Sequence, residues 1–274
     1  MMASRFSSVV AAAFAEAPSA PGRWHVALHG VRVAARVDGS WLAMQSPAVT
    51  DATPIELLAR NAALPGLVKF GRDRDGGIVV CAQIPIDDLT STVPLIRDAC
   101  TGFEFAASSL SAVNEMASVS ADLQSLCMEA GWNFTARSDG SLAVELECRD
   151  TFIQATLSAQ GEGVHVFVEL ADGDESMPAI AEMLLIASST VRLARPVMVP
   201  RDGKPSPRFE VAFSTMPTAA QLAHALSALS VACATCAEEV VALQNTNVAG
   251  EYLALRSQPN GCVHSANKQT KGDP

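Results

Sequence analysis

The chain has 274 residues, nearly half of them apolar, and a formal net charge of −10. This composition excludes a disordered chain, because enough apolar surface is present to form a core. The acidic charge argues against nucleic acid as a partner, since such binding needs cations that neutralise phosphates. The seven cysteines are scattered without a dense framework, so we expect a soluble, cytoplasmic protein with reduced thiols.

The first half of the sequence contains a regular succession of helical and strand-like patterns. An apolar stretch near the N-terminus predicts an amphipathic helix over Ser4–Ala17 rather than a cleaved signal peptide, because its apolar core is short and Glu16 lies inside the would-be cleavage site. No stretch of the chain reaches the roughly 20 uninterrupted apolar residues of a membrane span, so no membrane partner is expected. The patterns that follow predict strands at Trp24–Leu28, Val31–Val37 and Trp41–Gln45, a helix capped by Thr53, a hairpin of Leu67–Gly71 with Ile78–Ile84, and a long helix from Asp87 to Val113.

The second half of the sequence repeats this order of elements from Ser118 onward. Short matches fall at equivalent places: Arg72-Asp73 in the first hairpin corresponds to Arg201-Asp202 in the second. The second half also contains one extra strand-like segment. The patterns predict a helix through Cys127, strands at Trp132–Arg137, Ser141–Cys148, Phe152–Ala159 and Val164–Leu170, a helix from Pro178, a hairpin of Pro196–Val199 with Phe209–Phe213, and a helix from Thr218 to Leu243.

This internal repetition predicts an α+β fold built from two tandem copies of one unit. Each copy is expected to be an antiparallel sheet with helices on one side, in the order helix, three strands, helix, two strands, helix. We expect the first copy at 1–117 and the second at 118–249. The remaining residues, 250–274, are polar and lack periodicity, so they are predicted to form a mobile tail.

One motif region, about sixty residues of the first copy, is similar to a known family. It consists of Leu57-Leu58-Ala59-Arg60-Asn61, Lys69-Phe70-Gly71, Asp75-Gly76-Gly77-Ile78-Val79-Val80 and Ile84-Pro85-Ile86-Asp87-Asp88-Leu89. These segments resemble the type III secretion chaperone-like superfamily, which includes Tir-chaperone-type and YbjN-like proteins and shares the order of elements given above. The second copy matches by element order more than by residue, and it lacks a clear counterpart of Asn61.

The resemblance implies a protein-binding fold without catalysis. Secretion chaperones of this type are acidic homodimers that hold an extended segment of a secreted protein against apolar patches and a sheet edge. They carry one copy of the unit, so a tandem chain implies an intramolecular pseudo-dimer, or a homodimer of whole chains. The alternative is a YbjN-like regulatory or assembly protein that has the same fold and no secretion client.

Four aromatic side chains are the candidate partner-binding residues: Trp24, Trp41, Trp132 and Phe152. Large aromatics are enriched at binding hot spots, although core packing is the common alternative for a tryptophan. We expect no catalytic residues and no cofactor, because the sequence contains no phosphate loop, Gly-rich dinucleotide motif or nucleophile elbow.

Two further patterns have metal-site character, but we interpret both as structural. Cys233 and Cys236 lie three residues apart on an apolar helical stripe; a zinc site needs four ligands and no second pair is present, so core thiols are predicted. The acidic segments at 73–77 and 172–175 lack the glycine and glutamate that an EF-hand requires. They are predicted to be polar turns, and no metal site is expected.

Overall fold

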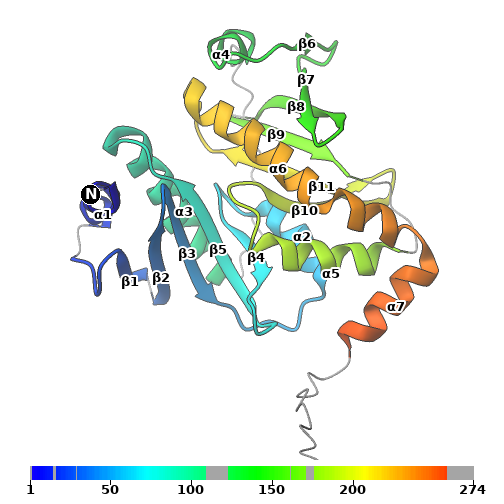
Figure 1. The fold of residues 1–274 in the computed structure, drawn as a ribbon, viewed down its shortest axis with the longest axis horizontal. Helices are drawn as coiled ribbons and strands as arrows, with labels where there is room; N and C mark the ends of the chain where they lie inside the picture. Colours follow the sequence, from blue (N-terminus) through cyan, green and yellow to red (C-terminus); the bar gives the residue numbers. More distant parts are fainter. Residues whose placement is uncertain are drawn as a thin grey trace, which may run out of the picture.

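A computed structural model describes residues 2–14, 17–28, 30–108, 123–160, 162–170 and 176–257. The described chain contains a five-stranded and a six-stranded antiparallel sheet with helices packed against them (Figure 1). The predicted α+β class is therefore confirmed.

The first half follows the order helix, three strands, helix, two strands, helix. Its strands lie side by side in the order β1-β2-β3-β5-β4. Thr53 caps the second helix in a capping box with Glu56, and Asp88 caps the third. The elements are α1 (Met2–Phe14), β1 (Arg23–Leu28), β2 (Val31–Asp38), β3 (Trp41–Pro47), α2 (Pro54–Ala63), β4 (Lys69–Arg72), β5 (Ile78–Pro85) and α3 (Leu89–Ala107).

The second half has the same order of elements, with one short strand and one helix added. Its sheet has the order β10-β11-β9-β8-β7-β6, so β7 to β11 lie in the same sequence of neighbours as β1 to β5. The elements are α4 (Leu123–Glu129), β6 (Thr135–Ala136), β7 (Leu142–Cys148), β8 (Thr151–Gln160), β9 (Gly163–Glu169), α5 (Met177–Ser188), β10 (Arg195–Arg201), β11 (Lys204–Phe213), α6 (Ala219–Leu243) and α7 (Thr246–Arg256).

Each sheet packs one face against helices of its own half. In β1, for example, Trp24 and Val26 are buried, whereas Arg23, His25 and Ala27 are exposed, because successive side chains of a strand point to opposite faces. α1 and α3 contact one another and the first sheet, and α6 lies across β7, β8, β9 and β11. The apolar core therefore fills the space between each sheet and its long helix (Figure 1).

Among the described residues, α6 is the one helix long and apolar enough to cross a membrane. Its buried residues recur every three or four positions, and this side faces the second sheet. A helix that covers a sheet inside a protein passes the same length and composition test, so we interpret α6 as a core helix. The buried residues include Leu222, Leu226, Leu229, Cys233, Cys236 and Val240.

Two details of the predicted organisation differ from the structure. The tail was expected from residue 250, but α7 continues to Arg256, because the Asn245 side chain caps its first turn and Ala249 is buried against the helices before it. The strand expected over Trp132–Arg137 is reduced to the two residues of β6, which pair only with β7. The predicted border between the copies, 117/118, and residues 258–274 lie outside the described residues.

Candidate functional site

The two halves meet through one helix and one edge strand from each half: α2 and β4 from the first, and α5 and β10 from the second. α2 packs on β10, α5 packs on β4, and α2 contacts α5. Because α2 and β4 occupy the positions in the first half that α5 and β10 occupy in the second, these contacts are reciprocal. We call this interface the seam; in Figure 1 it lies between the two sheets, where α2, α5, β4 and β10 come together.

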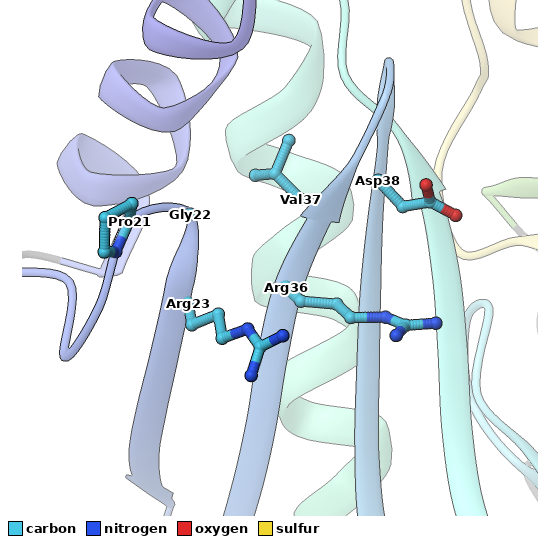
Figure 2. A pocket seen from close by; sticks show the side chains of 6 residues that line it. All are labelled: Pro21, Gly22, Arg23, Arg36, Val37 and Asp38. Atoms are coloured by element: carbon cyan, nitrogen blue, oxygen red, sulfur yellow. The ribbon is translucent and has the colours of Figure 1, made fainter.

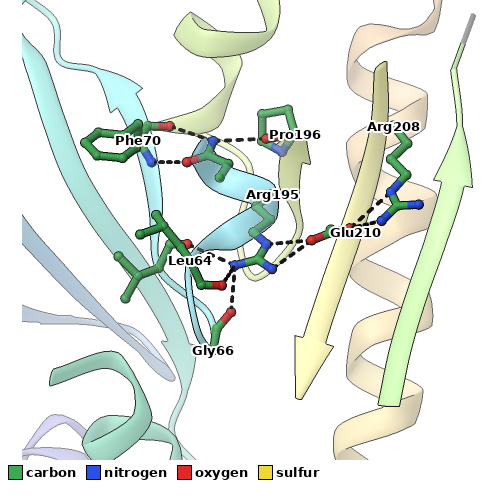
Figure 3. Close-up of polar contacts among 9 residues, drawn as sticks. Leu64, Gly66, Phe70, Arg195, Pro196, Arg208 and Glu210 are labelled. Atoms are coloured by element: carbon green, nitrogen blue, oxygen red, sulfur yellow. Dashed lines mark hydrogen bonds and ion pairs between the residues drawn. The ribbon is translucent and has the colours of Figure 1, made fainter. Parts of the chain in front are cut away.

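A buried cation begins each of the two edge strands at the seam. Lys69 is the first residue of β4 and Arg195 the first residue of β10; both are at most 1 % exposed. Each donates hydrogen bonds to carbonyl oxygens of the loop that precedes the other strand, and so satisfies backbone groups of the opposite half. Figure 3 shows those of Arg195. The acceptors are Val191 and Ala194 for Lys69, and Leu64, Gly66 and Val68 for Arg195.

The two buried cations differ in their partners: Arg195 is bonded to a buried carboxylate, whereas Lys69, among the residues that the structure describes, is bonded only to carbonyl oxygens. Glu210 accepts hydrogen bonds from Arg195 at 3.0 and 2.7 Å and from Arg208 at 3.1 and 2.7 Å. Burial alone would raise the pKa of Glu210, but the two guanidinium groups outweigh it and the pKa is lowered. Burial lowers the pKa of Lys69 to about 8; Cys81 opposes this shift, and the positive charge of Arg195 adds to it. The second half therefore holds its cation with a carboxylate, whereas Lys69 depends on carbonyl oxygens.

Each seam helix also sends one polar side chain to the opposite edge strand. Asn61 of α2 donates to the carbonyl oxygen of Pro196 at 3.0 Å, and Ser188 of α5 donates to that of Phe70 at 2.7 Å. Phe70 and Pro196 are the second residues of their strands, so the two acceptors are equivalent. Gly71 permits the close approach, because a Cβ there would lie 3.2 Å from that of Ser188. Ser188 of the second half thus makes the bond to the opposite edge strand that Asn61 makes from the first half.

Outside the seam, β1 forms a free edge of the first sheet. The amide of Val37 donates to the carbonyl of Gly22 at 2.9 Å, so these two residues form a hydrogen-bonded pair. Bonded and non-bonded pairs alternate along antiparallel strands. The next residue, Arg23, and every second residue after it, His25 and Ala27, therefore point their backbone groups away from β2. The turn that precedes β1 provides hydrogen-bond partners for the outward-facing backbone groups of Arg23. In the described part of the chain, His25 and Ala27 have no backbone partner on this side.

Beside this edge, two arginines face each other on the open side of the sheet. Arg23 and Arg36 are directly opposite in the register of β1 and β2, and both line a surface hollow of about 310 Å³ (Figure 2). They form a non-hydrogen-bonded pair, the kind that brings opposing side chains closest. Within the described ranges neither forms an ion pair; Asp38, in the same hollow, bonds to Arg192 at 3.0 Å.

The corresponding side of the second sheet is a wider concavity of about 710 Å³. Arg208 stacks over the ring of Phe167 at 4.4 Å, and Arg137 donates to Thr156 at 3.0 Å. Burial lowers the pKa of nearby His165 to about 4, so this imidazole is neutral at pH 7. This surface combines aromatic and polar groups, and its cations are largely engaged by neighbouring acceptors.

The structure does not bring the four predicted aromatics together on one surface. Trp24 is fully buried on the helix side of the first sheet, 6.1 Å from the ring of Phe14, so it belongs to the core and presents no surface to a partner. Trp41 is partly buried beneath Arg192, 5.3 Å from its ring centroid, close to the seam. Trp132, just after α4, is partly buried, and Phe152, on β8, is 69 % exposed.

The metal-like patterns form structural elements. Cys233 and Cys236 are buried, and burial raises their pKa values to about 12 and about 11, so the prediction of core thiols is confirmed. Asp73 accepts hydrogen bonds from the amides of Asp75 and Gly77, as a polar turn does; residues 172–175 lie outside the described ranges. Across the described segments, no three His, Cys, Asp or Glu side chains are grouped so that they could hold a metal ion.

Sequence reasoning missed the residues that organise the seam and the arginine pair beside β1. No role was assigned to Lys69, Arg195 or Glu210, although one cation at the start of an apolar strand, at the same place in each half, was a detectable signal. Arg23 and Arg36 were also missed. Comparison with known proteins adds no further assignment: no family model, curated protein or solved structure matches the chain.

Proposed function

We propose that this chain is a non-enzymatic, chaperone-like protein-binding module that holds an extended segment of a partner protein. The observation that carries the proposal is the free edge of β1, where His25 and Ala27 have backbone groups without a partner in the described chain. An extended polypeptide added alongside β1 would satisfy those groups, which is how many sheets capture peptides.

The plan of the two halves supports this proposal. Each half follows the order of elements shared by type III secretion chaperone-like proteins, and the reciprocal seam is the arrangement expected of two such units paired within one chain. We therefore propose that the halves arose by duplication of one unit. The six cysteines of the described residues are all free thiols, which suits a reducing cytoplasm.

The halves differ in a way that favours the first as the binding unit. β7 is the counterpart of β1, but part of its outer edge is occupied, because Thr135 and Ala136 of β6 pair with Ala143 and Leu142. The edge of β1 carries no such strand in the described chain. A segment that binds by strand addition is therefore expected at β1.

A matched pair of variants at one position tests strand addition. Ala27→Pro removes an outward-facing amide without removing a bond to β2, whereas Ala27→Val keeps the amide. We expect peptides selected on the wild-type protein from a displayed library of random sequences, about twelve residues long, to bind Ala27→Val normally. We expect them to bind Ala27→Pro roughly tenfold more weakly by fluorescence polarisation.

Circular dichroism and thermal melting would show whether both variants stay folded. The proposal is contradicted if the library yields no binders, or if the selected peptides bind the folded Ala27→Pro protein as tightly as the wild type.

A further inference from the structure

We infer that the extended segment bound at β1 is acidic, with carboxylates at alternate positions that face a cluster of three arginines. This inference rests on the proposed function and names the chemistry of the partner. The arginines are Arg23 on β1 and Arg32 and Arg36 on β2, all exposed on the open face of the first sheet. We call them the arginine cluster.

The matched strand positions of the second half carry no such cluster. In both halves the first hairpin closes on a two-residue turn, between Leu28 and Val31 and between Cys148 and Thr151, so positions can be matched by counting back from it. The six matched outer positions contain three arginines and a histidine in one half, but two glutamates and no base in the other. They are Arg23, His25, Ala27, Arg32, Ala34 and Arg36, against Ala143, Glu145, Glu147, Phe152, Gln154 and Thr156.

The cluster is also electrostatically unbalanced within the chain. Like charges directly opposite each other in a sheet are destabilising, and Arg23 lies directly opposite Arg36. In the ranges that the structure describes, no carboxylate pairs with any of the three arginines, although the whole chain has 29 acidic residues. An incoming anionic group would relieve this repulsion and form charge-assisted hydrogen bonds with the guanidinium groups.

Strand addition places carboxylates where the cluster can reach them. Alternate residues of an added strand point to the open face, beside Arg23, His25 and Ala27 of β1, and the others point to the helix side. Ala27 is small and lies directly opposite Arg32, so only a methyl group stands between that guanidinium and the added strand. The best-fitting segment therefore alternates Glu or Asp with apolar residues.

The test uses three end-blocked peptides of about nine residues, long enough to span β1, that alternate valine with glutamate, glutamine or lysine. By fluorescence polarisation we expect the glutamate peptide to bind at least about tenfold more tightly than the glutamine peptide. We expect its affinity to fall as NaCl is raised. The double variant Arg23→Glu with Arg36→Glu should reverse the preference and bind the lysine peptide.

The matched control is Arg74→Glu with Arg97→Glu. It makes the same change in net charge at two exposed arginines, one in the turn between β4 and β5 and one on α3. We expect it to leave the preference for the glutamate peptide unchanged. Loss of the preference in this control would show that net charge, not the cluster, selects the peptide, and would overturn the inference.

The remaining outcomes separate the inference from the proposed function. If all three peptides bind equally to the wild type and to the cluster variant, but not to Ala27→Pro, strand addition stands and the acidic preference is overturned. If none binds the wild type, both fail. Concentration-dependent self-association that the cluster variant abolishes would identify a second copy of the chain as the occupant, and would also overturn the inference.

Discussion

Replacing Arg195 with leucine is expected to lower the free energy of unfolding by about 3–5 kcal/mol, because it leaves a buried carboxylate with one partner fewer. Glu210 is fully buried and would keep only Arg208. The carbonyl groups of Leu64 and Gly66 would also lose their donor inside the seam. Urea unfolding followed by tryptophan fluorescence measures the change.

Two further variants identify the cause of that loss. Replacing Arg195 with methionine and Glu210 with leucine together removes the two fully buried charges and leaves Arg208, which is partly exposed to solvent; we expect it to restore most of the stability. Arg208→Leu, at a partly exposed side chain, is expected to cost less than Arg195→Leu. A double variant no more stable than Arg195→Leu would show that the loss comes from packing or from the carbonyl groups, and would contradict the electrostatic explanation.

Asn61→Ala is expected to destabilise the protein by about 3 kcal/mol, because it orphans buried backbone groups in both halves. Asn61 is fully buried; its oxygen accepts from the amide of Phe70 at 2.6 Å, and its nitrogen donates to Pro196 at 3.0 Å. The matched control is Ser188→Ala, which removes one bond to the carbonyl of Phe70 and leaves that carbonyl a second donor in Asn61.

We therefore expect the serine variant to cost about 1 kcal/mol or less. Urea unfolding of both variants under the same conditions gives the comparison. Equal losses would mean that the seam does not depend on the extra bonds of Asn61, and would contradict the role assigned to it.

Local signals in the sequence predicted most of the fold. Thr53 was predicted to cap a helix, and it does so through a capping box. Thr218, predicted only as the start of a helix, also caps it through a capping box. The strand that begins at Lys204 was predicted to start later, at Phe209. The added part contains Pro205 and Pro207, which cannot donate a backbone hydrogen bond to a sheet. They are accommodated because their backbone groups face away from β10, toward the side of β9, whose pairing with this strand begins only at Arg208.

The seam could not be predicted in this way, because its partners are far apart in the chain. Lys69 and Val191 are separated by 122 positions, and Arg195 and Leu64 by 131. A single sequence does not distinguish a buried lysine from an exposed one. The arginine cluster left a trace, since Arg32 and Arg36 alternate with apolar residues in one strand, but its meaning depends on Arg23 from the neighbouring strand.

The most direct test of strand addition is amide hydrogen exchange at β1, measured by NMR on isotope-labelled protein with and without the alternating valine and glutamate peptide. The amides of His25 and Ala27 should exchange rapidly in the free protein and at least about tenfold more slowly in the complex. Those of Trp24 and Val26, which face β2, should be slow in both states. A complex in which His25 and Ala27 exchange as they do in the free protein would contradict binding at this edge.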